Sequence, residues 1–426
     1  MADSPRRPGS AVLLDITAAS PEATDAALEA MHRAMADPAD GDIWQPLDDP
    51  ILRDLVEHWT LAGLKRLQGM WEDFLQLVTR VDGVLAKAGT PPERPPVDRL
   101  LRRWTGEELE QVKAYLEAKR PELWSFDDHL LAIEWIHQRW WPAEEVRTEA
   151  QWIAAKTIYA GRVQRAIQAR MKPLPVMALR DTWQYLPDVP GGGGEGPDKR
   201  RFIIHPNDTL AKLIEFGEAR CAQNIVALTD KSRRAMASII LEHQKALFAG
   251  DAAGTAESLE SKLLDTFGDL NRDWRRIALT EAAENAGNAL IASLPAGSRV
   301  RRIEVYATAC PYCKKIHGTE LTVADPGKAR YLDGEKFVWV GKSNIGRSAS
   351  PRKRVGGALV ERLPAERWWI PAGPVHPNCR GFWAVVDKPS EWVAKLPPEE
   401  RKEIDDFDKV LDAIAEKHRK TWKGEK

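Results

Sequence analysis

The sequence has few cysteines and no long apolar run, and each absence excludes a class of protein. Only four cysteines occur in 426 residues, too few for a secreted fold held together by disulfides. No run of about 18 uncharged apolar residues is present, so no helix is expected to span a membrane. The N-terminus is a poor signal peptide, because Asp15 interrupts the apolar patch that follows Arg6 and Arg7. We therefore expect a protein made and kept in a reducing cytoplasm, without a membrane partner.

The chain also lacks an excess of charge of either sign. Its 62 basic and 63 acidic residues leave a formal net charge of −1. A protein held to DNA mainly by its surface would usually be distinctly basic, so the composition does not favour bulk nucleic-acid binding. The 43% of hydrophobic and 29% of charged residues are typical of a folded chain with a buried core.

Apolar residues recur at helical spacing through most of residues 1–175, and no strand of note is indicated there. Thr105 and Glu108 have the spacing of a capping box, and Gly69 is a possible helix break. Helices are expected over 51–86, from Thr105, from Ser125 to Pro142, and over 148–171. We predict an N-terminal helical domain over 1–186. Most of the chain's 17 tryptophans lie there, which indicates packing between helices, with a docking surface as the alternative.

Residues 187–201 contain four consecutive glycines among prolines and charges, which predicts a flexible linker. No Gly-Lys-Ser or Gly-Lys-Thr follows them, so a phosphate-binding loop is not indicated. After the linker the helical spacing returns. Four helices, with Asp230 as the cap of the second, are expected to form a stalk over 209–294: 209–229, 230–250, 257–267 and 270–294.

The pattern changes to short alternating segments after residue 295. Alternation that includes Ile303 and Val305 predicts a strand over 300–308. Further short strands are expected over 337–340 and 382–386, which together would form a β-rich module over 299–386. The 40 residues 387–426 predict a charged helical tail with one narrow apolar face.

Two pairs of candidate metal ligands lie at the ends of predicted strands in this module. Cys310-Pro-Tyr-Cys313 follows the first strand, and His376-Pro-Asn-Cys379 precedes the last. Two ligands separated by two residues can face one ion, and thiolate and imidazole are ligands that zinc favours. Three cysteines and one histidine would close the coordination shell, which indicates a structural zinc ion. The alternative is that the cysteines are buried apolar residues and His376 caps a turn; His317 is a spare candidate ligand.

The Cys-Pro-Tyr-Cys sequence also matches the active site of glutaredoxins over four residues. A redox dithiol of that kind lies at the start of a long helix, which lowers the pKa of the first thiol. Here His317 and Gly318 are expected to stop any helix after one turn, and 319–323 returns to strand character. No Thr-Val-Pro segment is present to supply a cis-proline beside the dithiol. The redox interpretation is therefore disfavoured. The predicted fold class is mainly α with a small β-rich, zinc-knuckle-like module, a multi-domain α+β chain.

The order of these features resembles the Mu F-like domain of phage minor head proteins. A long helix with Arg276-x-x-x-Thr280-Glu281-x-x-x-Asn285 precedes a strand, Cys-x-x-Cys, a glycine and a late Pro-x-His-Pro-Asn-Cys-Arg. The resemblance covers roughly residues 210–386, so a Mu F-like domain is assigned to 202–386. It carries the family pattern to Thr280, Glu281, Cys310, Cys313, Gly318, Pro374, His376, Pro377, Asn378, Cys379 and Arg380.

Two departures from the family pattern concern the ligands and the segment between them. Family members often end the last motif in Cys-Arg-Cys, whereas Gly381 stands here, so His376 must be the fourth ligand. Between the half-sites, 341–357 carries a basic run, Arg347, Arg352, Lys353 and Arg354. We interpret this run as a solvated insertion loop, with contact to packaged DNA as the alternative. Glu281 is interpreted as a buried hydrogen bond or ion pair that fixes the helix against the knuckle, rather than as a catalytic group.

The resemblance implies a structural protein of the phage head, not an enzyme. Such a protein would be made in the host cytoplasm, enter the virion, and act in head morphogenesis near the portal. Its partners would be the portal protein and other head proteins, with Trp140 and Trp141 as candidate apolar anchors. A zinc-dependent nucleic-acid-binding protein is one alternative. A toxin-bearing relative with an effector domain is another, although the 40 residues 387–426 are too few for an independent catalytic domain.

Overall fold

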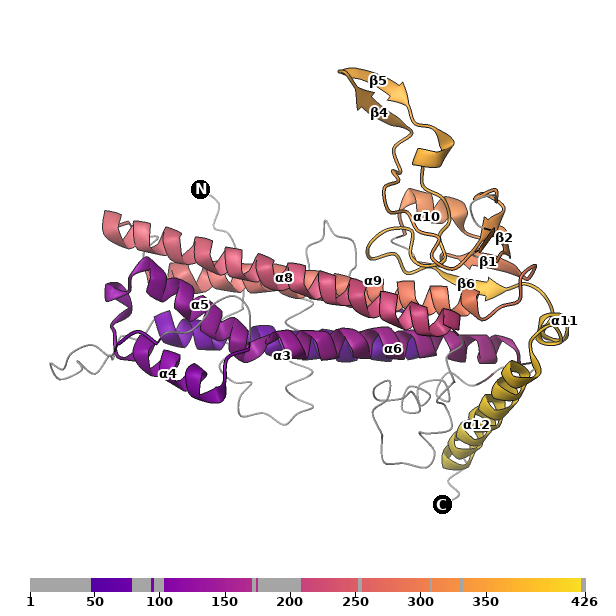
Figure 1. Cartoon of the computed structure of the whole chain (residues 1–426), viewed down its shortest axis with the longest axis horizontal. Coiled ribbons are helices and arrows are strands. Elements are labelled where there is room, and N and C mark those ends of the chain that lie inside the picture. The colour runs from indigo at the N-terminus through magenta and orange to yellow at the C-terminus, as the bar shows by residue number, and fades with distance from the viewer. Residues whose placement is uncertain are drawn as a thin grey trace. The chain divides into compact units, whose positions relative to one another are not determined.

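The computed structural model describes residues 47–78, 93–95, 103–170, 174, 208–251, 255–306, 309–325, 327–328 and 332–422. The described chain is mainly helical with a small mixed sheet, as the sequence predicted (Figure 1). The chain divides into two compact units: unit 1 comprises 1–45, 58–148 and 223–275, and unit 2 comprises 46–57, 149–222 and 276–426. The predicted linker 187–201 lies outside the described residues. In the described part, no helix is long and apolar enough to cross a membrane.

The described part of unit 1 is helical, and its short helices begin where the sequence places them. Helix α4 (Gly106–Glu117) starts at a capping box formed by Thr105 and Glu108. Helix α5 (Phe126–Trp140) starts at a second one, formed by Ser125 with Asp128, after the 3-10 turn η3 (Pro121–Leu123). Each box satisfies backbone N–H groups that a helix N-terminus leaves without partners. The predicted starts are therefore confirmed.

Helix α3 (Pro50–Val78) is continuous through Gly69, so the possible break there was wrong. A Cβ atom at Gly69 would overlap the ring of Trp140, and one at Gly63 would overlap the ring of Trp274. The Trp274 indole donates a hydrogen bond to the carbonyl of Trp59 at 2.6 Å. These glycines let large aromatic rings approach the helix backbone. The chain therefore has glycine at these positions although glycine is a poor helix former.

The tandem pair Trp140 and Trp141 belongs largely to this core. Trp141 is 3% exposed, and its ring lies 5.8 Å from that of Trp274. Trp140 is half-buried and donates a hydrogen bond to Asp73 at 2.6 Å. The expectation that this pair faces solvent as docking anchors was wrong for Trp141. A following Pro142 ends the helix but does not keep the ring out of the core.

The two long helices are longer than the sequence indicated. Helix α8 runs over Asp208–Ala249 and α9 over Ala256–Ala292, so the breaks predicted near 230 and 268 were wrong. Asp230 pairs with Arg233 on the helix surface instead of capping a new helix. Buried residues continue at helical spacing across the second predicted break: Leu259, Leu263, Phe267, Leu270 and Trp274. An unbroken apolar stripe keeps a helix continuous where local capping signals suggest an end.

Unit 2 contains most of α6 (Ala143–Gln168) together with the described parts of α8 and α9 that belong to it. Gly161 is packed against the carbonyl of Ala286, where a Cβ atom would not fit. The C-terminal helix α12 (Pro398–Trp422), which follows the short α11 (Pro389–Val393), forms ion pairs with α6. Arg165 contacts Glu400 at 2.7 Å. The predicted charged tail is thus a helix that packs against α6.

The small sheet has the strand order β3-β2-β1-β6. Its strands are β1 (Arg299–Ile303), β2 (Glu320–Val323), β3 (Phe337–Val338) and β6 (Phe382–Val385). The pairs β1–β2 and β1–β6 are antiparallel, and β2–β3 is parallel. The one-turn helix α10 (Pro311–Ile316) connects β1 to β2 and stops at His317, as expected. A strand occurs at each predicted position, but β1 ends at Ile303, before the predicted end at residue 308.

A second, two-stranded sheet lies in the segment predicted as an insertion loop. Strands β4 (Arg352–Val355) and β5 (Ala358–Glu361) form a hairpin, followed by the 3-10 turn η8 (Pro364–Glu366). Gly356 and Gly357 both have positive φ, 57° and 87°, which suits the tight turn of a two-residue hairpin. The segment is solvent-exposed, as expected, but it is more ordered than a loop.

Candidate metal centre

The first half-site is the start of α10. Cys310 is the N-cap of this helix, and its Sγ accepts a hydrogen bond from the backbone N–H of Cys313 at 3.4 Å. Pro311 occupies the first turn, where a missing N–H does no harm. Gly318, with φ of 80°, turns the chain back into β2. The short helix therefore places both sulfur atoms on one side of a single turn.

The second half-site is a tight turn that ends before β6. The backbone N–H of Cys379 donates to the carbonyl of His376 at 3.1 Å. Asn378 has φ of 64°, a left-handed conformation that Asn tolerates better than most residues. Its backbone N–H donates to Thr280 Oγ1 of α9 at 3.0 Å. The turn is thus shaped by its own sequence and anchored to the helix.

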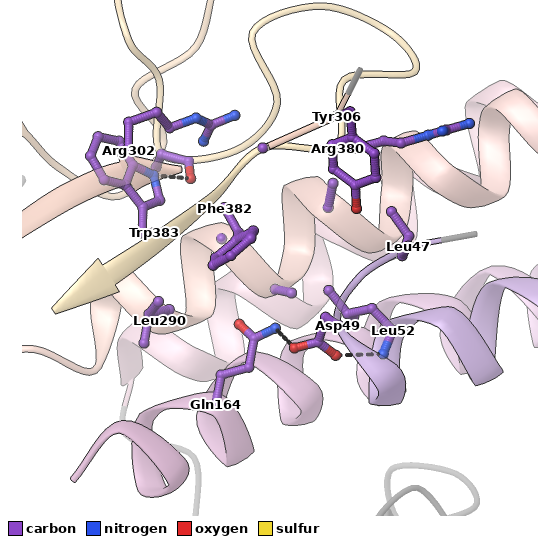
Figure 2. Close-up of a pocket in the computed structure, with 15 residues that line it drawn as sticks. Leu47, Asp49, Leu52, Gln164, Leu290, Arg302, Tyr306, Arg380, Phe382 and Trp383 are labelled. Carbon is purple, nitrogen blue, oxygen red and sulfur yellow. Dashed lines mark hydrogen bonds between the residues drawn. The ribbon is translucent and has the colours of Figure 1, made fainter. Parts of the chain in front are cut away.

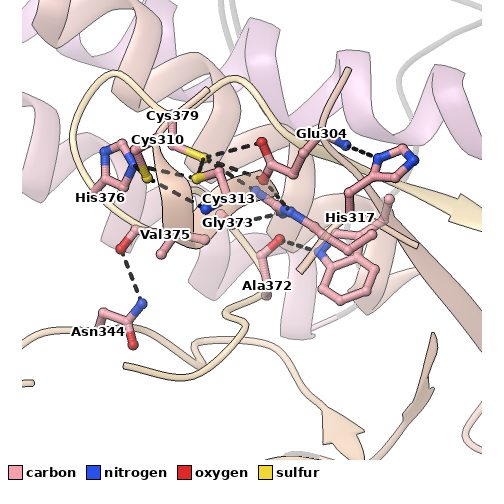
Figure 3. A network of polar contacts seen from close by, with 12 residues as sticks. Glu304, Cys310, Cys313, His317, Asn344, Ala372, Gly373, Val375, His376 and Cys379 are labelled. Carbon is pink, nitrogen blue, oxygen red and sulfur yellow. Dashed lines mark hydrogen bonds and ion pairs between the residues drawn. The ribbon is translucent and has the colours of Figure 1, made fainter. Parts of the chain in front are cut away.

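The two half-sites meet in one cluster (Figure 3). His376 Nε2 lies 3.3 Å from Cys310 Sγ and 3.4 Å from Cys313 Sγ, and Cys313 Sγ lies 3.7 Å from Cys379 Sγ. A tetrahedral zinc ion, at about 2.3 Å from sulfur and 2.0 Å from nitrogen, would separate its ligand atoms by roughly 3.5–3.8 Å. The ligand atoms of Cys310, Cys313 and His376 lie within 4.8 Å of one another. These three ligand atoms could hold a metal ion, whereas Cys379 approaches them only through Cys313 and falls in a second group with Cys313 and Glu304.

His376 is oriented for ligation through Nε2. Its Nδ1 lies 2.8 Å from the carbonyl oxygen of Pro377, so an N–H at Nδ1 donates there and leaves Nε2 with a lone pair. The ring also stacks on Trp368, with centroids 5.6 Å apart. The spare candidate His317 is placed differently: its Nδ1 accepts from the backbone N–H of Glu304 at 3.0 Å. His317 thus stabilises the chain after β1 instead of joining the cluster.

Two charged residues behind the sulfur atoms were not singled out from the sequence. Arg302 is fully buried and donates to Glu304 at 2.9 Å, to the carbonyl of Gly373 at 3.1 Å and to Cys379 Sγ at 3.5 Å. Glu304, Cys313 and Cys379 form a second group of ligand atoms within 4.8 Å of one another. The strand was predicted from Ile303 and Val305, but the structure buries the other face, with Val300 and Arg302, and leaves Val305 55% exposed.

The charges in this group stabilise an anionic sulfur. The pKa of Cys379 lies well below its ordinary value because Cys313 hydrogen-bonds it, and because Arg302 and the backbone N–H groups of Gly381 and Val375 add to this. The pKa of Cys313 is raised, first by its contact with Cys379 and then by burial. Burial raises the pKa of Glu304 to about 7, against the lowering effect of Arg302. Cys379 also lies 3.6 Å from Glu304 Oε1, so its sulfur is placed between a cation and a carboxylate, and the thiolate is the form of cysteine that binds metals.

Gly381 is required by the same arrangement. A Cβ atom at this position would overlap Glu304 Oε1 and crowd Arg302. Any side chain at 381, cysteine included, would have to displace the Glu304 carboxylate. In this chain the Glu304 carboxylate occupies the space that the side chain of a cysteine at 381 would need.

The motif residues Glu281 and Asn285 of α9 hold this helix to its neighbours in unit 2. Glu281 is 1% exposed, and its Oε1 and Oε2 accept hydrogen bonds from Arg220 of α8 at 3.1 and 2.9 Å. Arg220 also donates to Asn285 at 2.7 Å. The expected ion pair of Glu281 is present, but it joins two helices and not the helix and the knuckle. The contacts to the β module come instead from Thr280, described above, and from Asn288, which accepts from the N–H of Gly341 at 2.8 Å.

A small cavity lies in unit 2 beside this network (Figure 2). Its volume is about 30 Å³, and its lining is mostly apolar. On one wall Asp49 accepts hydrogen bonds from the N–H of Leu52 at 2.9 Å and from Gln164 at 2.6 Å. A space of this size has room for one or two water molecules and is far smaller than an ordinary ligand pocket.

Comparison with protein-family models, with curated proteins and with solved structures finds no match to this chain. Its function therefore has to be inferred from its own residues and geometry.

Proposed function

We propose that this chain is a structural minor head protein of a tailed phage, with a zinc-knuckle-like module in a multi-domain α+β fold. The observation that carries the proposal is the cluster of Cys310, Cys313, His376 and Cys379, set on α9 by Thr280. These residues occur in the order found in the Mu F-like family. The proposed role is head morphogenesis near the portal, in the virion, with the portal protein and other head proteins as partners.

The donor set supports a structural and not a catalytic ion. Three sulfur atoms and one imidazole nitrogen would fill a tetrahedral shell, leaving no position for a substrate or a reactive water. A bound zinc ion would supply a cross-link between the segment after β1 and the turn before β6. Arg302 would hold Cys379 in place, and the Pro377 carbonyl would fix the tautomer of His376.

The metal part of the proposal is tested by elemental analysis of protein purified without chelator. About one zinc per chain is expected. Cys379→Ser should lower the zinc content and destabilise the β module, while the helices of unit 1 remain folded. Cys221→Ser is the matched control, because Cys221 is a buried cysteine on α8 outside the cluster. Zinc-free wild-type protein, or equal zinc loss in both variants, would contradict the proposed zinc site.

The assembly part is tested by co-purification with the portal protein encoded beside it. The full chain should associate with portal or procapsid, and a portal and terminase gene should lie close upstream. A metal that acts only inside the β module predicts that the Cys379→Ser variant, with residues 345–367 unchanged, retains this association. Absence of any association of the wild-type chain with portal or procapsid would overturn the head role.

A further inference from the structure

The β4–β5 hairpin is a two-stranded sheet that no other described strand extends. It projects from the part of unit 2 that carries the four-stranded sheet (Figure 1). At its base, the described residues connect it by the bridge between Ser348 and Arg367. The outer edge of β5 therefore has backbone groups available for pairing, whereas at the outer edge of β4 the N–H and C=O of Arg352 are bonded to the Ser350 side chain. A two-stranded hairpin alone is marginally stable in water, and a free edge can accept a further strand.

The strand register divides the hairpin into two faces. The pairs Lys353–Val360 and Val355–Ala358 share one face, and Arg352–Glu361 and Arg354–Leu359 share the other. On the first face Val355 is 54% exposed and Val360 is 37% exposed. On the second, Leu359 is 60% exposed, and Leu363 beyond the strand is 66% exposed. Aliphatic side chains are therefore exposed on both faces of the hairpin.

The same segment is strongly basic in a chain that is otherwise balanced. Residues 345–367 carry six basic and two acidic residues, a net charge of +4, against −1 for the whole chain. Both acidic residues are already paired, Glu361 with Arg352 and Arg367, and Glu366 with Lys353. Among the described residues Arg354 has no ion-pair partner. The surface thus combines edge backbone groups, exposed aliphatic groups and uncompensated positive charge.

The edge, the aliphatic groups and the positive charge together favour one kind of binding partner over others. A second copy of the hairpin would bring two segments of charge +4 together, which disfavours self-association. Nucleic acid would neutralise the charge, but residues 345–363 contain no aromatic side chain on which bases could stack, and phosphates would leave the aliphatic groups exposed. An extended protein segment with acidic and aliphatic side chains satisfies the edge, the aliphatic faces and the charge together.

We propose that the β4–β5 hairpin binds an extended acidic segment of another protein, which adds a strand to one of its edges. The inference does not depend on the metal or on a role in the phage head. Backbone hydrogen bonds along the edge would supply affinity, and the basic residues would select acidic partners and accelerate their association.

The test uses the full chain and a fluorescent eight-residue peptide of alternating Val and Glu with blocked ends. Binding is measured by anisotropy at low salt, and hydrogen exchange over 352–361 reports strand addition. We expect the Val/Glu peptide to bind and to protect edge amides. A Val/Lys peptide should bind at least about tenfold more weakly because its charge is repelled. A Val/Glu peptide with two central prolines should lose binding to a similar extent, because proline cannot donate along a strand.

Variants assign the binding to the hairpin. Arg354→Glu should weaken binding of the Val/Glu peptide at least about tenfold. Arg401→Glu, the same charge change at an exposed position of α12, should change it less than about twofold. Equal binding of the Val/Lys peptide, or no effect of Arg354→Glu, would overturn the proposal. So would Arg354-dependent binding of a short DNA duplex in place of the peptide, or Arg354-dependent dimerisation of the chain.

Discussion

Both units bury tryptophan rings and charged groups, but unit 2 contains an ion pair, Arg302–Glu304, in which both side chains are no more than 1% exposed. Unit 1 packs tryptophan rings into notches made by glycine, as Trp274 does at Gly63. Unit 2 buries charged groups in pairs, among them Arg302 with Glu304 and Arg220 with Glu281. Packing of rings depends on shape, whereas a buried ion pair depends on each partner being present. The units should therefore respond differently to small changes of size and of charge.

The largest effect is expected when a buried charge in unit 2 loses its partner. Arg302→Met should lower the free energy of unfolding of unit 2 by about 3–5 kcal/mol, because Glu304 and Cys379 remain buried without their cation. Arg301→Met is the matched control on the same strand, since the ion pair of Arg301 with Glu320 is exposed and worth about 1 kcal/mol or less. Hydrogen exchange by mass spectrometry locates the change. Equal effects of the two variants would contradict the importance of the buried pair.

A smaller effect is expected on the pH dependence of the stability of unit 1, because this unit also contains a buried titratable group. Burial, with a contribution from Arg233, lowers the pKa of His137 from 6.5 to about 3. Below 6.5 the unfolded chain binds a proton that folded His137 does not, so stability falls as pH falls from about 6.5 towards 3. Between pH 7 and 4.5 unit 1 should lose about 2–3 kcal/mol from this group. His137→Gln should flatten this part of the pH dependence, and an unchanged slope in the variant would refute the assignment.

The smallest effect concerns shape in unit 1. Gly63→Ala should destabilise unit 1 by about 1–3 kcal/mol, although alanine is the better helix former, because the added methyl group overlaps the Trp274 ring. Gly106→Ala is the matched control, since a Cβ atom there meets nothing within 4 Å. Urea unfolding followed by tryptophan fluorescence measures both. A stabilised Gly63→Ala variant would mean that the ring moves aside freely.

Features determined by neighbouring residues were predictable, and features determined by distant ones were not. The helix starts at Thr105 and Ser125 follow from side chains three residues away, and the turn at Gly318 follows from its own sequence. The Cys and His spacing was sufficient to place Cys310, Cys313 and His376 in one cluster; zinc binding itself stays a prediction. By contrast, the charged pair Arg302–Glu304 lies inward because the loop before β6 surrounds it, which no local pattern indicates.

In the long helices and at Trp141, contacts with distant residues override the local sequence signals. Asp230 is a good N-cap in isolation, yet buried residues on both sides of it keep α8 helical. Trp141 precedes a proline and was expected at the surface, but the ring of Trp274, far away in the sequence, covers it. The hairpin was missed because its strand residues are exposed or half-buried on both faces, so they give no alternation of buried and exposed positions.

The pairing of β1 with β6 also determines when the module can form during synthesis. Arg301 pairs with Ala384, and Cys310 and His376 are 66 residues apart, so the first half-site leaves the ribosome well before its partner. Until then, β1 has no β6 strand to pair with. Cys310 and Cys313 are then only two of the four candidate ligands. Closure of such a long loop is slow compared with helix formation. A nascent chain that ends before residue 376 therefore carries only two of the four candidate ligands, and it is expected to expose the inner face of β1 while the helices of unit 1 are already folded.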